Sequence, residues 1–331
     1  MVLEKIRMNA LLENIADLPS AAQGGAVTIG NFDGVHRGHQ AIIEQVRQLA
    51  DEVSGPAVVF TFDPPPARLL RPQEAPEALT RIDRRSELLT KLGIDCVVVF
   101  PTSLELLRLE PEDFFEKIVV DALKAKAIAE GENFRFGRQR RGDIAMLKRL
   151  CDERNIRFSL LEPKQEQGAW ISSTRIRTQI ELGNIALANN LLVEPYRISG
   201  IVGRGAQRGR TLGFPTANLE QIPVLCPPPG VYAGRVVARK TSPGLANDIA
   251  AMNPVGLPVA INIGPNPTFG ESALKVETHI IGFAGNLYGQ ELEIELLEKL
   301  RDVQKFESKD HLIAQLNQDI QMAKQIAHPG E

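Results

Sequence analysis

The sequence predicts an α/β domain built on a parallel sheet, followed by a small antiparallel β-barrel that carries a C-terminal helix. In the first part of the chain, continuous apolar runs alternate with stretches of helical periodicity, which is typical of parallel strands covered by helices. After about residue 193, Gly and Pro become dense and short alternating segments replace the helices, which is typical of a small barrel. The length of 331 residues suits two domains, which we place at residues 1–193 and 194–331.

The first domain is expected to contain five strands, each a short run rich in residues that favour strands. They are residues 26–29, 57–62, 96–100, 127–130 and 157–161. Helical periodicity covers residues 84–92 and 111–125 between the strands, and 173–182 and 184–192 after them. Because ligands of open parallel sheets bind at the carboxyl ends of the strands, we expect a site in the turns that follow these strands.

The second domain is expected to be built from short strands joined by Gly- and Pro-containing turns. Alternating segments occur at residues 231–239, 258–263, 276–283 and 291–297. Residues 240–258 are polar with several Gly and Pro, which indicates an exposed loop. A helical pattern from residue 308 to about 326 closes the chain.

Composition excludes several classes of protein. The net charge is −3, so we expect neither a nucleic-acid partner nor a membrane-surface protein. The three cysteines, Cys96, Cys151 and Cys226, have neither zinc-site spacing nor a disulfide framework, which suits a reducing compartment. The N-terminal stretch lacks the features of a signal peptide, and no apolar run approaches the roughly 18 residues of a membrane span. These observations favour a cytoplasmic protein.

The first candidate site lies at residues 30–39, GNFDGVHRGH, where the first strand turns into a helix. Two of the five histidines of the chain, His36 and His39, lie here. Backbone N–H groups at a helix start attract anions, and Gly30 lets the chain approach a ligand closely. Positive, hydrogen-bonding imidazoles could hold a phosphate and stabilise the charge that grows as pyrophosphate leaves. Asn31 offers an amide donor, and Asp33 is expected to orient the turn.

The second candidate site lies at residues 209–219, GRTLGFPTANL. Pro215 favours an extended backbone, in which residues two apart face the same side. Thr216 and Asn218 therefore present a hydroxyl and an amide oxygen together, and both are ligands suited to Mg²⁺. The preceding segment, GRGAQRG, runs from Gly203 to Gly209 and could approach phosphates, although its spacing is neither the Rossmann fingerprint nor a P-loop.

Motifs of the first domain resemble a known family. GNFDGVHRGH resembles the GxFDGxHxGH signature of the nucleotidylyltransferase superfamily, most closely the flavin adenylyltransferase half of bacterial bifunctional riboflavin kinase/FAD synthetases. ISSTRIR, residues 171–177, resembles the second nucleotide-binding motif of that family, and GENFRFGRQRRGD, residues 131–143, also matches it. The resemblance implies a nucleotidylyltransferase-type sheet with His36 and His39 as catalytic residues. It also implies ATP or phosphate contacts by Gly30, Asn31, Phe32, Ser173, Thr174 and Arg175, and flavin contacts by Asn133 and Phe134.

Motifs of the second domain resemble riboflavin kinase, in the order found in that family. The matching blocks are residues 209–219, 229–234, 262–270, 276–283, 287–290 and 300–308. The resemblance implies that Glu277 acts as the general base on the 5′-hydroxyl of the flavin's ribityl chain, which fits the chemistry of phosphoryl transfer. It further implies phosphate contacts at Gly203 and Gly209, a flavin contact at Arg301 and a metal site at Thr216 and Asn218.

Taken together, the two resemblances imply two linked reactions. The second domain would phosphorylate riboflavin with ATP to give FMN, and the first would transfer AMP from a second ATP to FMN, giving FAD and pyrophosphate. Riboflavin, FMN and ATP are then the small-molecule partners. Mg²⁺ is the expected cofactor of both halves because it neutralises triphosphate charge.

The sequence departs from the family pattern at three places, and two alternative functions remain open. Pro65 stands where the family more often has His, so one alternative is a riboflavin kinase whose impaired N-terminal half acts as a flavin-binding module. Gly282 and Ala284 stand where acidic residues are common, and the segment after Asp302 lacks a Glu two residues on. Another alternative is that the histidine motif serves a different adenylyl or cytidylyl transfer or tRNA aminoacylation, which the kinase-like second half disfavours.

Overall fold

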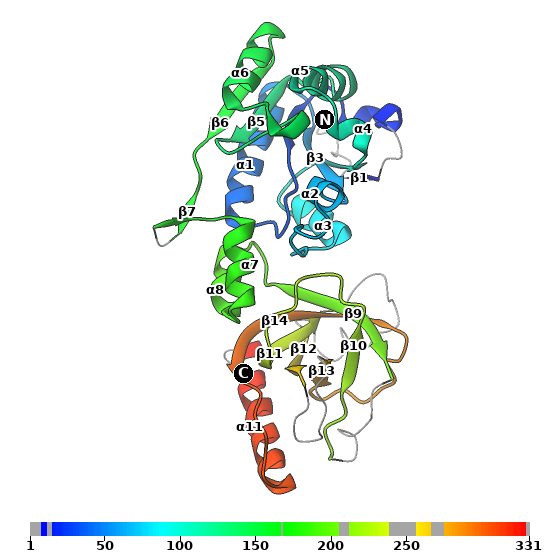
Figure 1. Ribbon diagram of the computed structural model, residues 1–331, viewed down its shortest axis with the longest axis vertical. Helices are drawn as coiled ribbons and strands as arrows, with labels where there is room; N and C mark the ends of the chain where they lie inside the picture. Colours follow the sequence, from blue (N-terminus) through cyan, green and yellow to red (C-terminus); the bar gives the residue numbers. More distant parts are fainter. Residues whose placement is uncertain are drawn as a thin grey trace, which may run out of the picture. The chain divides into compact units, whose positions relative to one another are not determined.

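The chain forms two compact units, Met1–Ser172 and Ser173–Glu331, in a computed structural model (Figure 1). The structure describes residues 8–11, 15–166, 168–204, 212–237, 256–265 and 275–328. Most of the expected loop at 240–258, namely residues 240–255, therefore lies outside the described residues. Among the described helices, none combines the length and the apolar composition that a bilayer span requires.

The first unit contains a six-stranded sheet in which every neighbouring pair is parallel. Its strands are β1 (Met8–Leu11), β2 (Ala26–Ile29), β3 (Ala57–Asp63), β4 (Cys96–Pro101), β5 (Ala127–Gly131) and β6 (Arg157–Leu161). The parallel sheet and its five expected strands are confirmed, and β1 is an additional edge strand beside β4. A short hairpin of β7 (Gln165–Glu166) and β8 (Ala169–Trp170) follows β6.

Helices lie against the sheet and bury its apolar side chains. They are α1 (Arg37–Glu52), α2 (Pro66–Leu70), α3 (Ile82–Lys91), α4 (Leu104–Leu107), α5 (Pro111–Phe114) and α6 (Ile144–Glu153), with short turns η1 (Ile15–Asp17), η2 (Ser20–Ala22) and η4 (Arg138–Arg140). After α5 the chain continues as the π-helical segment η3 (Phe115–Ala122). The core on one face of the sheet joins Phe60 and Ile128 to Phe115 of η3 and Leu147 of α6, all of them buried. On α1, apolar residues spaced as one helical stripe are buried, as the sequence predicts.

The strand order β1-β4-β3-β2-β5-β6 reverses direction between β2 and β5. The chain runs from β2 outward to β3 and β4, and then returns to place β5 on the other side of β2. In open parallel sheets the crevice at such a reversal, beyond the carboxyl ends of the strands, is where ligands bind. The turn after β2 and the loop after β5 therefore flank the same crevice.

The second unit is a closed barrel with strand order β10-β13-β12-β11-β14-β9, and every neighbouring pair is antiparallel. The strands are β9 (Arg197–Gly203), β10 (Ala217–Glu220), β11 (Gly230–Val237), β12 (Leu257–Gly264), β13 (Lys275–Ile280) and β14 (Glu291–Arg301). The barrel and the closing helix α11 (Lys309–Ala327) confirm the expected fold of this part. Ser308 caps α11 by accepting a hydrogen bond from His311 N at 3.2 Å.

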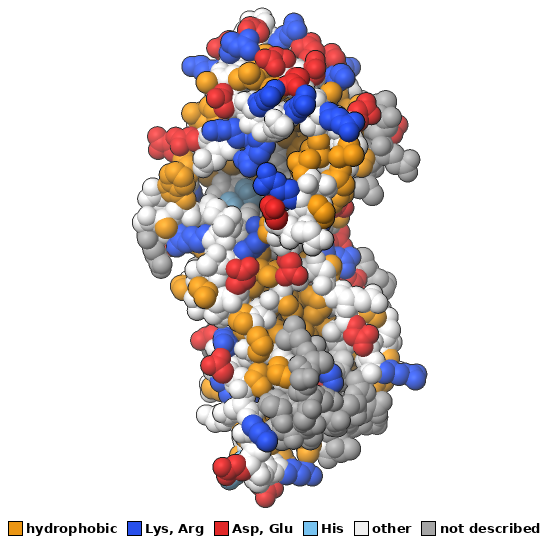
Figure 2. Space-filling view, in the orientation of Figure 1, with side chains coloured by type: hydrophobic (Ala, Val, Ile, Leu, Met, Phe, Trp, Pro, Cys, Tyr) orange, Lys and Arg blue, Asp and Glu red, His pale blue; other side chains and the backbone are white. Residues whose placement is uncertain are grey.

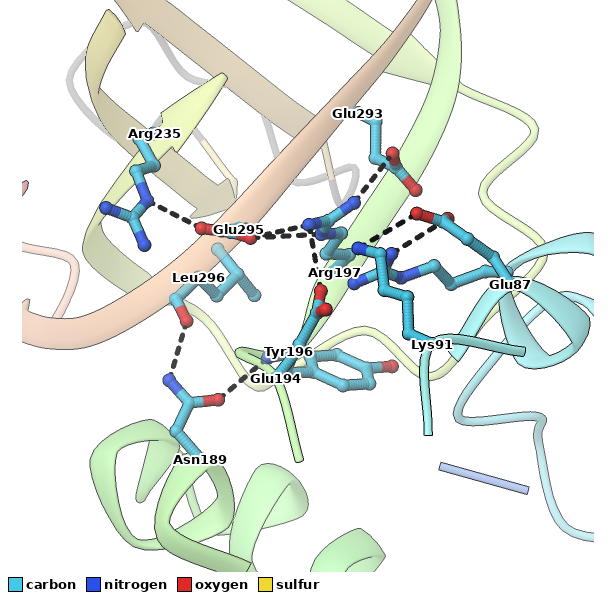
Figure 3. Close-up of polar contacts among 11 residues, drawn as sticks. Glu87, Lys91, Asn189, Glu194, Tyr196, Arg197, Arg235, Glu293, Glu295 and Leu296 are labelled. Atoms are coloured by element: carbon cyan, nitrogen blue, oxygen red, sulfur yellow. Dashed lines mark hydrogen bonds and ion pairs between the residues drawn. The ribbon is translucent and has the colours of Figure 1, made fainter. Parts of the chain in front are cut away.

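Helices α7 (Ser173–Glu181) and α8 (Ile185–Leu191) group with the barrel. Asn189 on α8 donates a hydrogen bond to the carbonyl of Leu296 on β14 (2.9 Å) and accepts one from Tyr196 N (2.8 Å). Figure 3 shows this bridge between helix and strand. The division of the chain by compactness thus falls near residue 172, and a boundary between catalytic domains at residue 193 stays a prediction.

Charged side chains also link the barrel strands. Arg197 on β9 lies between Glu293 and Glu295 of β14, with nitrogen–oxygen distances of 3.2 and 2.7 Å (Figure 3). Arg235 on β11 approaches the other oxygen of Glu295 at 2.6 Å. This cross-strand network joins three neighbouring strands at one level of the barrel.

Candidate functional site

The turn between β2 and α1 has an unusual backbone. Phe32, Gly34 and Val35 all have positive φ angles, of 50°, 84° and 28°. A β-branched residue such as Val35 rarely adopts this region, so the turn is strained and must be held by its surroundings. Backbone strain of this kind is concentrated at functional sites, which agrees with the phosphate-binding turn that the sequence predicts here.

The two histidines of the turn form a reciprocal helix cap. His36 Nδ1 accepts a hydrogen bond from His39 N at 3.2 Å, and His39 Nδ1 accepts one from His36 N at 3.3 Å. Their rings are stacked, with centroids 3.5 Å apart and an angle of 14° between planes. Because each Nδ1 is an acceptor, hydrogen bonding assigns the proton of each neutral ring to Nε2. The start of α1 therefore carries two stacked rings, each with an Nε2–H donor.

Both imidazoles are neutral near pH 7. Burial lowers the pKa of His36 to about 4. Burial also lowers the pKa of His39 well below its usual value, with further lowering by His36 and the guanidinium of Arg85. The expectation of positively charged imidazoles is therefore wrong, and these rings act as neutral hydrogen-bond donors. Figure 2 shows histidine surface in a recess of the first unit, beside Lys and Arg side chains.

Asp33 fastens the turn to the segment before α3. Its buried carboxylate accepts hydrogen bonds from Leu79 N at 3.0 Å, from Thr80 N at 2.9 Å and from the Thr80 hydroxyl at 3.0 Å. It also pairs with the buried guanidinium of Arg85 at 3.2 Å. The orienting role expected for Asp33 is supported by these contacts. Thr80 and Arg85 were missed by sequence reasoning, because they lie 47 and 52 residues away from Asp33 in an unremarkable helix start.

The loop after β5 is aromatic and closely packed. Phe134 stacks on Phe136 with centroids 5.6 Å apart, and the backbone of Phe136 pairs with Gly142 in both directions. Gly137 has a φ of 68°, and a Cβ there would lie 2.6 Å from the backbone of Pro111. This loop therefore holds Phe134 half-buried and leaves its neighbour Asn133 exposed at the crevice between β2 and β5. Arg138 and Arg141 pair with Glu110 at the surface, at 3.1 and 3.4 Å.

The segment that leads into the second predicted nucleotide motif also reaches the histidine turn. An ideal Cβ built on Gly38 would lie 3.3 Å from the carbonyl oxygen of Ile171 and 3.1 Å from the His36 ring. Ser173, Thr174 and Arg175 form the start of α7, in the second compact unit. Within the first unit, the chain is therefore beside the turn only two residues before Ser173.

In the barrel, strand register places most of the predicted kinase residues in one row. Asn218 on β10 pairs directly with Glu277 on β13, and Glu277 pairs with Asn262 on β12. The row extends on one side to Gly203, opposite Asn218, and on the other through Val231 to Arg301. Directly opposed residues of antiparallel strands point to the same face with Cβ atoms about 5 Å apart.

This row lies on the outer face of the barrel. The alternating residues next to it, Ala217, Thr278 and Ile261, are buried in the interior. Asn262 was not among the predicted site residues, although it belongs to one of the blocks that resemble the kinase. Its position beside Glu277 depends on pairing between strands, which local sequence does not report.

The predicted metal ligands lie at one end of the row. Thr216 immediately precedes β10, and the Pro215 carbonyl lies 2.8 Å from Nδ1 of His279 on β13. Phe214 packs edge-on against the same ring, with centroids 5.9 Å apart. The hydroxyl of Thr216 and the side-chain oxygens of Asn218 and Glu277 are hard donors of the kind that Mg²⁺ prefers, so these residues fit that ion.

Two other predicted residues have different outcomes. Arg301 donates a bidentate pair of hydrogen bonds to the carboxylate of Asp319 on α11, at 3.0 Å from Nε and 2.7 Å from Nη2. Its guanidinium carbon lies 5.8 Å from the centre of the Phe306 ring. Its guanidinium thus fixes α11 against the barrel, and a flavin contact by Arg301 stays a prediction. Gly209 lies outside the described residues.

Comparisons with known proteins agree with both halves. The family model for FAD synthetase matches residues 18–175, and the model for riboflavin kinase matches residues 192–327. A bifunctional riboflavin kinase/FMN adenylyltransferase of Escherichia coli K12 is 35% identical over 317 residues, covering 96% of this chain and 97% of the relative. A protein of the same name from Haemophilus influenzae is 35% identical over 320 residues, with coverages of 95% and 98%.

A solved structure matches along almost the whole chain as well. The crystal structure of a macrolide-efflux protein from Streptococcus pneumoniae has a TM-score of 0.81 and 28% identity, and covers 96% of this chain and 98% of that one. This match spans both halves of the chain, as the matches to the sequence relatives do. From these matches and the two sites described above, the chain belongs to the family of bifunctional riboflavin kinases/FMN adenylyltransferases.

Proposed function

We propose that this chain phosphorylates riboflavin to FMN in its C-terminal half and adenylylates FMN to FAD in its N-terminal half, using one ATP for each step. The observation that supports the proposal is that His36 and His39 form one cap at the sheet reversal, while Asn218 and Glu277 lie side by side in the row on the barrel. We place the catalytic halves at residues 1–193 and 194–331. ATP as co-substrate and three cysteines without a disulfide framework favour the cytoplasm.

In the N-terminal half, a phosphate oxygen of FMN attacks the α-phosphorus of ATP. The bond from that phosphorus to the bridging oxygen breaks, and the bond's electrons leave with pyrophosphate. The Nε2–H groups of His36 and His39 donate to the oxygens whose negative charge grows, and the N-terminus of α1 adds a favourable dipole. The remaining contacts proposed with ATP are Gly30, Asn31, Phe32, Ser173, Thr174 and Arg175, and those with the flavin are Asn133 and Phe134.

In the C-terminal half, Glu277 takes the proton of the ribityl 5′-hydroxyl while that oxygen attacks the γ-phosphorus of ATP, and ADP leaves. Gly203 and Gly209 are proposed to approach the phosphates, and Arg301 to contact the flavin. Thr216 and Asn218 would hold Mg²⁺, which supplies charge neutralisation for the triphosphate when it is bound. The row on the barrel supports this assignment because it sets Glu277 directly beside Asn218.

The test uses two substitutions and two matched controls. His36→Ala should make FMN from riboflavin but form FAD from FMN at least about 100-fold more slowly, since one removed donor to developing charge costs about that factor. Glu277→Ala should lose FMN formation and keep FAD formation from supplied FMN. The exposed residues His311 and Glu298 provide the controls His311→Ala and Glu298→Ala, which should retain both reactions.

Product chromatography with riboflavin, ATP and Mg²⁺, and separately with FMN, ATP and Mg²⁺, gives the readout. If the unaltered chain makes FMN but never FAD, the N-terminal half is the impaired module that Pro65 suggests. If neither reaction occurs with flavins, the histidine motif serves another transfer and the proposal fails.

A further inference from the structure

A buried acid lies at the sheet reversal that separates β2 from β5. Glu130 is the penultimate residue of β5 and is only 3% exposed. Its Oε1 accepts a hydrogen bond from the backbone N of Ile29, the last residue of β2, at 2.7 Å, and one from the Thr28 hydroxyl at 3.3 Å. Neither the sequence motifs nor the proposed mechanism gives this residue a role.

The side chain of Glu130 replaces a backbone hydrogen bond at the point where β2 and β5 stop pairing. The partners of β2 and β5 are Ala26 with Ala127 and Val27 with Ile128, and the pairing then ends. On the other side of β2 the ladder goes further, because Gly30 N still bonds to the carbonyl of Phe60 on β3 at 3.0 Å. On the β5 side, the Ile29 N–H meets the side chain of Glu130 in place of a backbone carbonyl.

This bond joins the two segments that flank the crevice. Ile29 is followed at once by the strained turn that carries the histidines, and Glu130 is followed by the loop that carries Asn133 and Phe134. Asp33 fastens the middle of the turn, and the reciprocal cap fastens its end. The hydrogen bond with Glu130 holds the beginning of the turn. Of these three sets of contacts, it is the one that connects the turn to β5.

We infer that Glu130 is a positioning residue for adenylyl transfer, which holds the histidine turn at a fixed separation from the flavin-side loop by bridging the gap between β2 and β5. The inference rests on the proposed function of the N-terminal half. The length of the side chain is the decisive property. The acceptor oxygen, carried on two methylene groups, spans the gap, and a shorter side chain would draw the strands together or release the turn. A misplacement of the turn by about 1 Å can cost up to about 100-fold in rate.

The protonation state makes glutamine a close mimic. Burial raises the pKa of Glu130 well above that of an ordinary carboxyl, despite the opposing hydrogen bonds from Ile29 N and Thr28. Burial thus favours the neutral acid, and Glu130→Gln matches that form in length, in lack of charge and in its acceptor oxygen. Glu130→Asp keeps the acid but shortens the arm by one methylene group.

A matched control exists at the opposite edge of the same sheet. Asp95, just before β4 and 8% exposed, accepts a hydrogen bond from Ala57 N at 2.9 Å, where β3 begins. It makes the same kind of bond between a buried carboxyl and a strand N–H, but at the amino ends of the strands, away from the crevice. Asp95→Leu therefore reproduces the loss of such a bond without touching the turn.

The experiment measures kcat and KM for FAD formation from FMN, while circular dichroism and thermal unfolding measure the folded fraction of each variant. We expect Glu130→Gln to stay within about threefold of the unaltered chain, and Glu130→Asp to lose about 10- to 100-fold in kcat with little change in KM. Glu130→Leu should lose at least as much as Glu130→Asp, while Asp95→Leu keeps the FAD-forming kcat of its folded fraction.

The outcomes separate the claims. An active Glu130→Asp beside an inactive Glu130→Gln would overturn the inference, because acidity rather than reach would then matter. Equal effects of Glu130→Leu and Asp95→Leu on kcat would also overturn it, since the role would be stability alone. If Glu130→Leu does not fold, the kcat values of Glu130→Gln and Glu130→Asp still test whether side-chain length matters. If the unaltered chain forms no FAD, the proposed function of this half fails instead.

Discussion

The stacked pair His36 and His39 shows how a helix start can present two neutral donors to one ligand. The Nδ1 of each ring accepts a hydrogen bond from the backbone N–H of the other residue. The two histidines thus form the capping box of α1 between them. The rings are thereby fixed in one tautomer before any substrate arrives. Preorganised donors of this kind need no rearrangement when charge develops.

Side-chain nitrogen NMR can check this arrangement directly. Among the five histidines, two should show the Nε2–H tautomer and stay neutral as the pH falls to about 5, because burial disfavours their charged forms. His36→Asn should remove one of these two signals and identify it. Two rings that both titrate near their usual pKa of about 6.5 would contradict the assignment.

The same shift predicts how stability depends on pH. The folded-state pKa of His36 is lowered to about 4, so the unfolded chain takes up a proton near pH 6.5 while the folded chain does not. Stability from this residue is present above pH 6.5 and is lost as the pH falls toward 4, on the order of 3 kcal/mol in all. Urea unfolding at several pH values, followed by the single tryptophan Trp170, should show a shallower pH dependence in His36→Asn than in the unaltered chain. Parallel curves would rule out this contribution.

Gly38 offers a test of close packing beside the cap. A methyl group there would lie 3.1 Å from the His36 ring and 3.3 Å from the Ile171 carbonyl, closer than such contacts normally allow. Alanine is the better helix former, so Gly38→Ala should leave thermal stability unchanged or higher while FAD formation falls about tenfold. FMN formation should not change. Gln48→Ala, at an exposed position of α1, is the control, and equal FAD rates in both variants would exclude the crowding.

At the scale of elements, helix α11 is tied to the barrel by one buried charge. Asp319 is 1% exposed, and its carboxylate accepts the bidentate hydrogen bonds of Arg301 and one hydrogen bond from Gln315 at 2.9 Å. Arg301 is the last residue of β14 and belongs to the same row as Glu277, so the helix and the row share one anchor. Substituting Asp319 should therefore reduce the formation of FMN by the C-terminal half.

Asp319→Ala should destabilise the C-terminal unit by about 3–5 kcal/mol, because it leaves a partly buried guanidinium without its carboxylate. FMN formation should fall with it, whereas FAD formation from supplied FMN should persist. Thermal unfolding and both assays check this, with Asp310→Ala, exposed in the first turn of α11, as the control. Equal melting temperatures for the two variants would show that the pair contributes little.

Sequence patterns identified the elements whose signal is local. Strands β2 to β6 are short segments rich in apolar and β-branched residues, and helix α11 begins at a capping serine, so each could be located from neighbouring residues alone. Strands β1 and β10 have four residues each, as β2 has, but their sequences MNAL and ANLE mix apolar with polar residues and lack the apolar run of AVTI in β2. β9 contains two glycines, which weaken a strand pattern.

The site residues that sequence reasoning missed depend on contacts between distant segments. Asn262 meets Glu277 only through the pairing of β12 with β13, and Glu130 meets Ile29 only because β5 returns to the side of β2. Arg85 is read locally as one of several charged residues at a helix start, and it is the fold that buries it against Asp33. Periodicity can place such residues on an element but cannot pair the elements.

At the scale of the whole molecule, the residues proposed for the two reactions come from different parts of the chain, within residues 30–175 and 203–301, so the two reactions should be separable. A mixture of His36→Ala and Glu277→Ala chains should convert riboflavin to FAD, because FMN released by the first variant can be used by the second. The appearance of FAD should show a lag that shortens as the chains are concentrated. Absence of FAD from the mixture, with each variant active in its own step, would show that FMN does not pass through solution.

The row that runs from Gly203 through Asn218, Glu277 and Asn262 has a further consequence for how this protein can change over generations. Each member comes from a different strand, and inserting or deleting one residue within a strand would turn every following side chain of that strand to the opposite face. The connections between the strands are under no such constraint, since lengthening a loop costs little free energy. Insertions and deletions should therefore be excluded within the strands of the barrel, even at positions where any single amino-acid replacement is harmless. They should be tolerated between the strands, except between Gly203 and Ala217, where Gly209 and Thr216 are proposed to contact phosphate and Mg²⁺.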